Sequence, residues 1–489
     1  MKKIKLIAYA IVGFISVLSC RDAIDVVQDG ELYEQDAIKS ISDLRGFLNG
    51  NVYGALDTSS EIWLTSVFTD EAGLAPSNSG WYFAEHRYIL TPDNSYVAGT
   101  WGSHYAAINR VNRLLEVAKL VTPAAGDETK RYNSILAEAR TMRALAYLQL
   151  QSYFTTDMTN DNALGVILVE GVPTLDTQLP RVTNAKIYEQ IESDLKYAEE
   201  NLWIDDEDHK LDNYKFVTMN LVNAIRARMY LYRKDYTKAK QYAEDALIGI
   251  TMVGPAADGT SNPYKMMWQD RAQGEIIFAL SRPTSGPGGD IARFWTTNTT
   301  SISGSPLLKM GMNLYNLISS SWDIRGKAFV DPSSSATVKI IDKYPGKSGA
   351  PLKNDIKVFR ASEMWFIIAE AEAAAGNLTV AADIVRNIRS NRRMITVTIP
   401  TPTYATKEDA YRDILQERRA ELCFEGHRYV DLRRLGAIAG VSIDRSPLDD
   451  GDKGLFAPLT LPIDDYRWTY PIPSSERLGN PNIVQNPDY

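Results

Sequence analysis

The chain has 489 residues, a formal net charge of −8 and only two cysteines. Its negative charge argues against nucleic acid as a ligand and against electrostatic adsorption to anionic lipid. Two cysteines are too few for a disulfide framework, so the fold must draw its stability from a large hydrophobic core.

The first residues have the pattern of a secretory signal peptide. Lys2, Lys3 and Lys5 precede an apolar run over residues 6–18, which is too short to span a bilayer. Removal of these lysines with the signal peptide changes the net charge by three units, from −8 to −11. The run therefore predicts export of the protein rather than a transmembrane helix.

The apolar run ends in Val-Leu-Ser-Cys at residues 17–20, which resembles the lipobox of bacterial lipoproteins. We therefore predict a signal peptide at residues 1–19 and acylation of Cys20. Two or more acyl chains suffice for stable anchoring, and the polar stretch 20–35 suits a tether to a domain at residues 36–489. An ordinary secretory signal with a chance cysteine is the alternative.

Strongly helical segments alternate with long irregular stretches along the rest of the chain. The regions 58–98 and 251–358 are rich in turn-forming residues, and residues 275–280 are the strand candidate within them. Residues 156–183 are predicted to be extended or looped, and the tail 445–489 to be irregular. Apolar residues at helical spacing predict helices at 36–57, 101–120, 130–154, 184–202, 216–233, 236–249, 360–375, 378–393, 407–424 and 427–436.

Two helical hairpins share a repeat pattern. In residues 216–249, alanines lie at helical spacing on both sides of a short turn, and residues 360–393 repeat this arrangement. Small residues at such positions let two antiparallel helices approach closely, which is typical of the tetratricopeptide repeat. Because a long insertion separates the copies, we expect a broken helical array rather than a regular solenoid. Two unrelated hairpins are the alternative.

The most specific motif lies at residues 417–434, which read ERRAELCFEGHRYVDLRR. Many of its charged residues fall three or four positions apart, a spacing at which helical side chains pair along one face or bridge to the next element. An acid–base or metal site formed by Glu417, Glu421 and His427 is the alternative, but the H-E-x-x-H spacing of zinc proteins is absent. The motif therefore favours a structural ion-pair network.

This motif closely resembles the signature of the SusD/RagB family of outer-membrane nutrient-binding lipoproteins. The segments 471–476 and 485–489 resemble the C-terminus of that family. The resemblance extends, in order, over nearly the whole chain after the predicted signal peptide. It implies a mainly α fold of tetratricopeptide-like helix pairs, with long irregular loop insertions and little β-structure. Further matches are Trp101, Tyr105, Ile108, Asn112, Glu138, Arg143, Tyr147, Pro180, Arg181, Ile187, Tyr188, Phe359, Arg360 and Glu363.

The sequence shows little sign of catalytic chemistry. Its four histidines are scattered, and it has no G-x-S-x-G, no P-loop, no dinucleotide-binding glycine motif and no CxxC pair. The acidic turn at 449–452 lacks the alternating ligands of a calcium loop and is more typical of a solvated turn. We expect no enzyme activity, no cofactor and no metal. The 61 Asp and Glu residues leave a carboxylate pair in a cleft as an alternative.

In SusD-like proteins the helical scaffold faces a partner transporter and the glycan sites lie in loops outside it. The resemblance therefore implies ligand contacts in the insertions near 58–98 and 251–358. Exposed aromatic rings there can stack on a pyranose while Arg, His and Asn side chains reach its hydroxyls. Aromatic residues that only cover the core are the alternative. The candidate ligand-binding residues are Trp81, Tyr82, His86, Arg293, Trp295 and Asn298.

The resemblance implies a non-catalytic lipoprotein, anchored to the outer membrane through Cys20 and facing the cell exterior. Such a protein captures an oligosaccharide or polysaccharide and delivers it to a TonB-dependent, SusC-like transporter. Several alternatives stay open. They are a peptide-binding, RagB-like lid of a transporter, a glycan hydrolase on the same scaffold, a scaffold that holds a protein partner in its tetratricopeptide groove, and an orientation toward the periplasm.

Overall fold

The computed structural model describes residues 38–489 apart from residues 175, 204–212, 258–261, 287, 296–305 and 454–457. The predicted signal peptide, Cys20 and the tether at 20–35 lie outside the described residues, as does Asn298. Within the described part, no helix is both long enough and apolar enough to cross a bilayer.

The first described helix runs into a π-helical turn. Helix α3 (Ile41–Phe47) begins at Ser40, whose hydroxyl accepts a hydrogen bond from the Asp43 amide, while the Asp43 carboxylate accepts one from the Ser40 amide. A π-helical segment (Leu48–Val52) and the short helix α4 (Tyr53–Ala55) follow. Together these segments correspond to the first predicted helix.

Helix α5 (Ser59–Phe68) lies in the region 58–98, which the sequence predicted to be loop-like. That prediction was wrong for this helix because its buried residues lie on all sides, Glu61 among them, so that no apolar stripe marks it. The region also contains the short strand β1 (Ala72–Leu74) and helix α6 (Phe83–His86).

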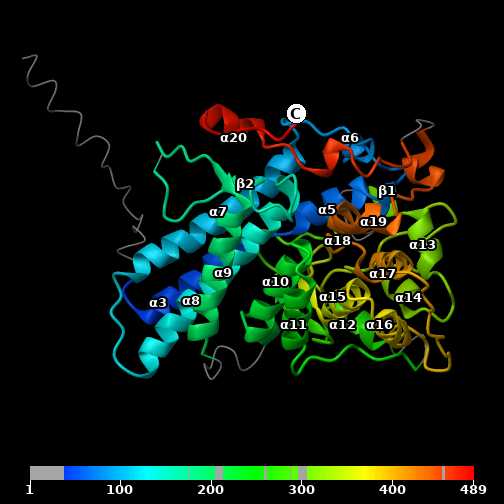
Figure 1. Cartoon of the computed structure of the whole chain (residues 1–489), viewed down its shortest axis with the longest axis horizontal. Coiled ribbons are helices and arrows are strands. Elements are labelled where there is room, and N and C mark those ends of the chain that lie inside the picture. The colour runs from blue at the N-terminus through cyan, green and yellow to red at the C-terminus, as the bar shows by residue number, and fades with distance from the viewer. Residues whose placement is uncertain are drawn as a thin grey trace, which may run out of the picture.

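Three long helices pack side by side at one end of the molecule (Figure 1). They are α7 (Ser95–Ala118), α8 (Asp127–Phe154) and α9 (Asn184–Asn201), and each matches a predicted helix. Helix α7 begins earlier than predicted because the side chain of Asn94 accepts hydrogen bonds from two amides of the first turn.

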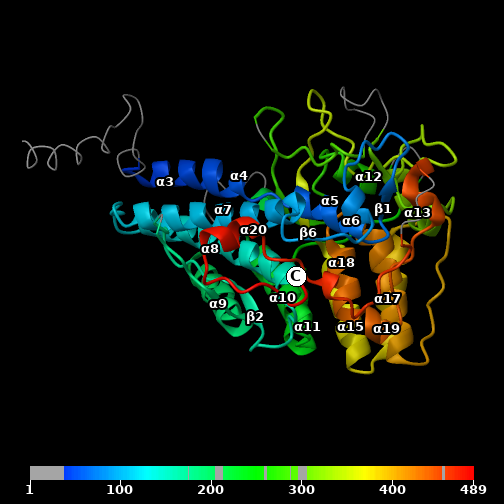
Figure 2. The ribbon, with the colours of Figure 1, turned by 90° about the horizontal axis from the view of Figure 1, so that it is seen from above.

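Two helix pairs stack on each other although a long insertion separates them in the sequence. Helix α10 (Met219–Tyr232) packs against α11 (Tyr236–Ala246), and α15 (Ala361–Ala374) packs against α16 (Leu378–Asn391). Helix α11 lies beside α15, which joins the two pairs into one array (Figures 1 and 2). The repeated alanines are fully buried, which confirms the predicted broken array: Ala224, Ala227, Ala239, Ala243, Ala246, Ala369, Ala373 and Ala381.

Helix α17 (Lys407–Leu422) packs against α15 and α16 and carries the first part of the predicted ion-pair motif. Helix α18 (His427–Asp431), a π-helical segment (Leu432–Gly436) and α19 (Ala437–Ala439) follow. In the described part of the tail, which was predicted to be irregular, the regular structure is limited to short helical turns such as α20 (Ser474–Gly479).

The insertion folds back onto the N-terminal part of the chain through a short sheet. Its strand β5 (Leu308–Met310) pairs antiparallel with β1, so that Gly73 lies opposite Lys309. The predicted strand is confirmed as β4 (Ile276–Leu280), which pairs antiparallel with β6 (Ile356–Arg360). Other short elements are β2 (Leu164–Ile167), its partner β3 (Arg181–Thr183), α12 (Pro263–Trp268), α13 (Met312–Ile318) and α14 (Ile324–Phe329).

Two hydrophobic clusters form the core. The larger cluster contains buried residues from Ile38 to Ile483, so both ends of the described chain contribute to it. The smaller cluster lies among α15, α16 and α17 and includes Phe366, Val385 and Ile414. This packing confirms a mainly α fold with helix pairs, irregular insertions and minor β-structure.

Candidate functional site

A tight turn before α6 presents Trp81 at the surface. The side-chain amide of Asn78 donates to the carbonyl of Trp81 (2.9 Å) and to that of Leu307 (3.1 Å), and its oxygen accepts from the Gly80 amide. Tyr82 then adopts the left-handed conformation with φ 56°, which is uncommon for a bulky residue. The Trp81 side chain remains 39% exposed.

Arg293 lies beside this indole. Its guanidinium carbon is 5.8 Å from the centre of the Trp81 ring. Phe294 braces the indole from within, with a ring-to-ring distance of 5.3 Å, and itself packs edge-on against Trp63 at 4.7 Å. Among the described residues, no side chain forms an ion pair or hydrogen bond with the exposed Arg293 guanidinium. The two predicted residues Trp81 and Arg293 therefore form a braced aromatic surface beside guanidinium donors that no described side chain engages.

Three other predicted ligand-binding residues lie in the core. Tyr82 is 1% exposed and stacks on Tyr96 at 3.9 Å, and burial raises its pKa. His86 is also buried, and burial, reinforced by nearby Arg445, holds its pKa well below the ordinary value, so that the imidazole is neutral. Trp295 is fully buried. Because none of the three presents a face to solvent, we exclude them from the candidate surface.

The loop that contains Trp81 contacts the C-terminal part of the chain through Arg87. Arg87 stacks on Phe83, with 3.7 Å between its guanidinium carbon and the ring centre, and pairs with Asp450 at 2.7 Å. The neighbouring Asp449 was predicted to lie in a solvated turn, but it is buried and accepts a hydrogen bond from the Met312 amide at 2.9 Å. That prediction failed because the turn closes over β1 and α13.

The charged motif forms a buried ion-pair network, as predicted. Glu421 accepts hydrogen bonds from Arg360 (3.0 Å), Arg392 (2.9 Å) and the Tyr264 hydroxyl (2.8 Å). The carboxylate of Glu275 pairs with the guanidinium groups of Arg360 and Arg392, each at 2.7 Å. Although burial opposes ionisation, these arginines hold the pKa of Glu421 well below its ordinary value. The network joins α17 to β4, β6 and α16.

The network extends along both ends of the motif. The carboxylate of Glu417 accepts hydrogen bonds from Arg325 at 2.6 Å and from Arg389 at 2.7 Å. Arg434 at the other end contacts the carboxylates of Glu370 and Asp431. Each of these carboxylates is saturated by guanidinium groups, which supports a structural role.

The catalytic alternative for this motif gains no support from the geometry. His427 is buried, and burial together with neighbouring arginines such as Arg228 and Arg418 holds its pKa well below the ordinary value. Across the described ranges, no group of three or more His, Cys, Asp or Glu side chains is arranged to hold a metal ion. Cys423 is buried beside this network, and burial raises the pKa of its thiol to about 12.

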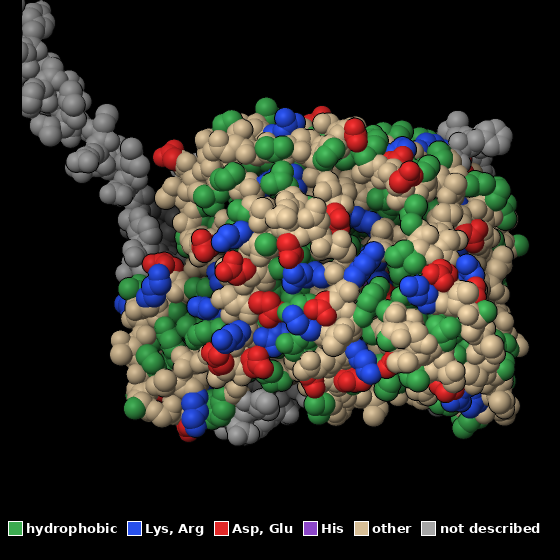
Figure 3. Space-filling view, viewed as in Figure 1, with side chains coloured by type: hydrophobic (Ala, Val, Ile, Leu, Met, Phe, Trp, Pro, Cys, Tyr) green, Lys and Arg blue, Asp and Glu red, His purple; other side chains and the backbone are tan. Residues whose placement is uncertain are grey.

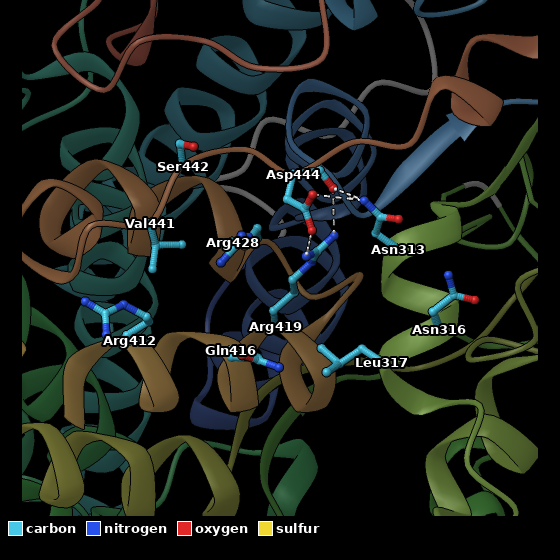
Figure 4. A pocket seen from close by; sticks show the side chains of 10 residues that line it. All are labelled: Asn313, Asn316, Leu317, Arg412, Gln416, Arg419, Arg428, Val441, Ser442 and Asp444. Carbon is cyan, nitrogen blue, oxygen red and sulfur yellow. Dashed lines mark hydrogen bonds and ion pairs between the residues drawn. The ribbon is translucent and has the colours of Figure 1, made fainter. Parts of the chain in front are cut away.

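A hollow of about 490 Å³ lies between α13, α17 and the segment 441–444 (Figure 4). Sequence reasoning missed it because its walls come from elements far apart in the chain. The available signal was the spacing of Arg412, Gln416 and Arg419, which places three polar side chains on one face of α17. The complete lining is Asn313, Asn316, Leu317, Arg412, Gln416, Arg419, Arg428, Val441, Ser442 and Asp444.

One face of the molecule carries both signs of charge. On the face shown in Figure 3, Lys and Arg side chains are interspersed with Asp and Glu side chains rather than gathered into one patch. Local groups, rather than the overall field, therefore decide what this face can bind.

Comparison with known proteins gives consistent matches. The model of the SusD family matches residues 310–489, and a second family model, described as starch-binding associating with outer membrane, matches residues 24–231. The SusD-like protein P2 of Formosa agariphila is 24% identical to this chain over 100% of both. The SusD-like protein P38 of the same organism is 24% identical over 73% of this chain and 77% of its own.

Solved structures share the fold. A putative sugar binding protein from Bacteroides vulgatus superposes with a TM-score of 0.74 at 24% identity, over 93% of this chain and 99% of its own. A SusD superfamily protein from Bacteroides thetaiotaomicron gives 0.75 at 23% identity, over 92% and 100%. These matches agree with the motif at residues 417–434, the buried ion-pair network and the broken helical array. Over nearly its whole length, therefore, the chain is similar to proteins of the SusD family.

Proposed function

We propose that this protein captures a glycan at the surface formed by Trp81 and Arg293, without changing the glycan chemically. The observation that carries the proposal is the half-exposed indole of Trp81, braced from below and flanked by a guanidinium that has no partner among the described residues. The family supports the ligand class, since one matching family model is described as starch-binding and one structural relative as a putative sugar binding protein.

The geometry suits a saccharide for two reasons. The face of an indole can cover the apolar C–H face of a pyranose, and the neighbouring guanidinium can donate directional hydrogen bonds to its hydroxyls. Because Phe294 and the Asn78 turn already hold the indole in place, binding costs little side-chain ordering. Asn298 is retained as a proposed contact, although it lies outside the described residues.

The proposal includes a membrane anchor and a partner. Acylation of Cys20 would hold the domain at the outer membrane, facing the exterior, beside a TonB-dependent, SusC-like transporter that receives the glycan. Labelling cells with radioactive palmitate tests the anchor, and a Cys20→Ser variant that keeps the label would contradict it. Protease treatment of intact cells tests the orientation, and co-purification from the outer membrane tests the partner. Full protection from protease, or the absence of any transporter, would contradict these parts.

The central experiment uses residues 21–489, which include every described residue. A glycan array identifies a ligand, and calorimetry then compares the wild type with Trp81→Ala and Tyr466→Ala. Tyr466 is a matched control because it is 41% exposed and has Arg467 5.6 Å from its ring, but that arginine is paired with Asp465.

We expect Trp81→Ala to weaken glycan binding about thirtyfold, as for a central aromatic anchor, and Tyr466→Ala to leave it unchanged. A folded wild type that binds no glycan would contradict the proposal, as would equal losses in the two variants. Binding of peptides instead of glycans would favour the peptide-binding alternative.

A further inference from the structure

The hollow beside α17 has a floor built from two buried arginines. Arg428 is 3% exposed, and its Nε and Nη2 donate to the two carboxylate oxygens of Asp70 at 2.9 and 2.8 Å. Arg419 is 8% exposed and approaches the same carboxylate at 3.4 Å. These arginines hold the pKa of Asp70 well below its ordinary value, so the carboxylate stays ionised. Two guanidinium groups thus share one buried carboxylate, which leaves the floor with positive charge.

Two buried donors in this floor, Nη1 of Arg428 and Nε of Arg419, have no hydrogen-bond partner in the described part of the chain, although Nε of Arg419 lies 3.4 Å from the Asp70 carboxylate. A buried, charged donor without an acceptor costs free energy, because water that solvated it in the unfolded chain is lost. Arg428, Arg419 and Arg412 all line the hollow; in Figure 4 Arg428 and Arg419 lie at its centre, whereas the guanidinium of Arg412 lies at one side and points away from them. An acceptor that enters this space would satisfy Nη1 of Arg428.

The rim adds one further cation and several neutral polar groups. Arg412 is exposed; its Nη1 pairs with Asp409 at 2.9 Å, an ion pair that water screens, and its Nε donates to the Ala439 carbonyl at 3.2 Å, so that Nη2 is the donor it can offer a ligand. The side chains of Asn316, Gln416 and Ser442 form no hydrogen bond with any described residue. The rim therefore offers donors and acceptors at a distance from the charged floor.

One carboxylate at the rim opposes anion binding. Asp444 pairs with Arg419 at 3.3 Å and accepts a hydrogen bond from Asn313 at 2.9 Å. Its side chain is 62% exposed, so water screens its charge, whereas the arginines of the floor are screened far less. The balance at the floor remains in favour of an anion.

We propose that this hollow binds the carboxylate of an acidic saccharide, at a site separate from Trp81. The carboxylate would accept from Nη1 of Arg428 and from Arg412, the geometry for which guanidinium groups are suited. The neutral rim groups would take the sugar hydroxyls. The volume of about 490 Å³ falls in the range of about 300–1,000 Å³ found for ligand pockets. The saccharide part of this inference rests on the proposed function, while the carboxylate part does not.

The test compares trigalacturonate, its fully methyl-esterified form and sodium acetate at constant ionic strength, measured by calorimetry on residues 21–489. Arg412→Gln removes the exposed cation without touching the buried Asp70 pair. Arg386→Gln is the matched control, because Arg386 is a helical, exposed arginine paired with Asp383 three residues earlier, as Arg412 is with Asp409. Trp81→Ala is measured in parallel.

We expect the wild type to bind trigalacturonate, with affinity at least about tenfold lower for Arg412→Gln and unchanged for Arg386→Gln, since a charge-assisted hydrogen bond is lost. The esterified form should bind at least about tenfold more weakly than the acid. The inference is overturned if trigalacturonate does not bind, if the neutral ester binds equally well, or if the two arginine variants behave alike. Binding of acetate alone would leave a free-anion site and overturn the saccharide part.

The Trp81→Ala arm separates the two proposals. If this variant loses a neutral glycan but keeps trigalacturonate, both sites stand as distinct. If Arg412→Gln has no effect while Trp81→Ala abolishes all binding, the second site is refuted and the proposed function remains. If only Arg412→Gln weakens binding, the second site stands and the assignment of the glycan surface to Trp81 fails.

Discussion

Two arginine–aromatic contacts in this protein look alike and differ in one respect. In the core, the guanidinium carbon of Arg392 lies 4.1 Å from the centre of the Tyr264 ring, and at the surface that of Arg293 lies 5.8 Å from the Trp81 ring. Arg392 also donates to the carboxylates of Glu275 and Glu421, whereas Arg293 has no such partner among the described residues. Saturation by carboxylates, rather than residue type, separates a structural contact from a candidate binding surface.

The largest expected effect comes from breaking the saturated contact. Glu421→Gln removes the charge that Arg360 and Arg392 share, and leaves guanidinium groups in the core with fewer carboxylates. We expect the free energy of unfolding to fall by about 3–5 kcal/mol, the usual result of removing one partner of a buried ion pair. Urea denaturation followed by circular dichroism measures this change.

The control is Glu244→Gln. Glu244 lies 3.8 Å from Lys240 on the surface of α11 and is 55% exposed, so its loss should cost less than about 0.5 kcal/mol. If Glu421→Gln changes the free energy of unfolding no more than this control, the network does not hold the helical array to the insertion. The structural role assigned to the saturated Arg392 contact would then be wrong.

Much of the ion-pair network and of the helical array could be predicted from the sequence. The spacing within residues 417–434 indicated ion pairs, and the repeated alanines indicated two stacked helix pairs; both are visible because helical periodicity is local. The partners of the motif were not visible, since Glu275 directly precedes β4 and Arg392 directly follows α16, both far from the motif in the sequence. Helix α5 was missed for a related reason: a helix buried on all sides has no apolar stripe.

The candidate surface could be predicted only in part. Trp81 and Arg293 are the exposed residues among the described members of the proposed set, and Tyr82, His86 and Trp295 are buried. Trp81 is exposed and its neighbour Tyr82 is buried because the left-handed turn at Tyr82 directs their side chains apart. The sequence of the turn does not predict this conformation, since the left-handed residue is a tyrosine rather than a glycine. The hollow beside α17 was missed because three separate elements form it.

The second expected effect applies the same comparison to two adjacent carboxyl groups. Asp70 is paired with Arg428, whereas Oε1 of the neighbouring Glu71 is buried without a hydrogen-bond partner in the described part of the chain. Burial raises the pKa of Glu71 to about 7 from an ordinary 4.5. The folded state therefore binds a proton between pH 4.5 and 7 that the unfolded state has released, and stability falls as the pH rises through this window.

Glu71→Gln should remove this loss. The free energy of unfolding of the variant, relative to that of the wild type, should rise by up to about 3 kcal/mol when the pH is raised from 4.5 to 8. Urea denaturation of both proteins at the two pH values measures this change. The buried, neutral His86 and His427 act in the opposite direction, because their pKa values are lowered, but their contribution is common to both proteins and cancels in the difference. A difference that does not change with pH would show that Glu71 is ionised in the folded protein.

The smallest expected effect on stability, and the sharpest test of the comparison, concerns two surface arginines beside exposed aromatic rings. Arg467 donates to Asp465 at 2.7 and 2.6 Å, whereas Arg293 has no carboxylate partner among the residues that the structure describes. We expect Arg467→Gln to lower the free energy of unfolding by up to about 1 kcal/mol and Arg293→Gln by less than about 0.5 kcal/mol. Glycan binding should show the reverse order, with a loss only for Arg293→Gln, because a guanidinium already held by a carboxylate has fewer donors left for a ligand. If both variants lose the same stability and the same affinity, saturation does not distinguish the two contacts.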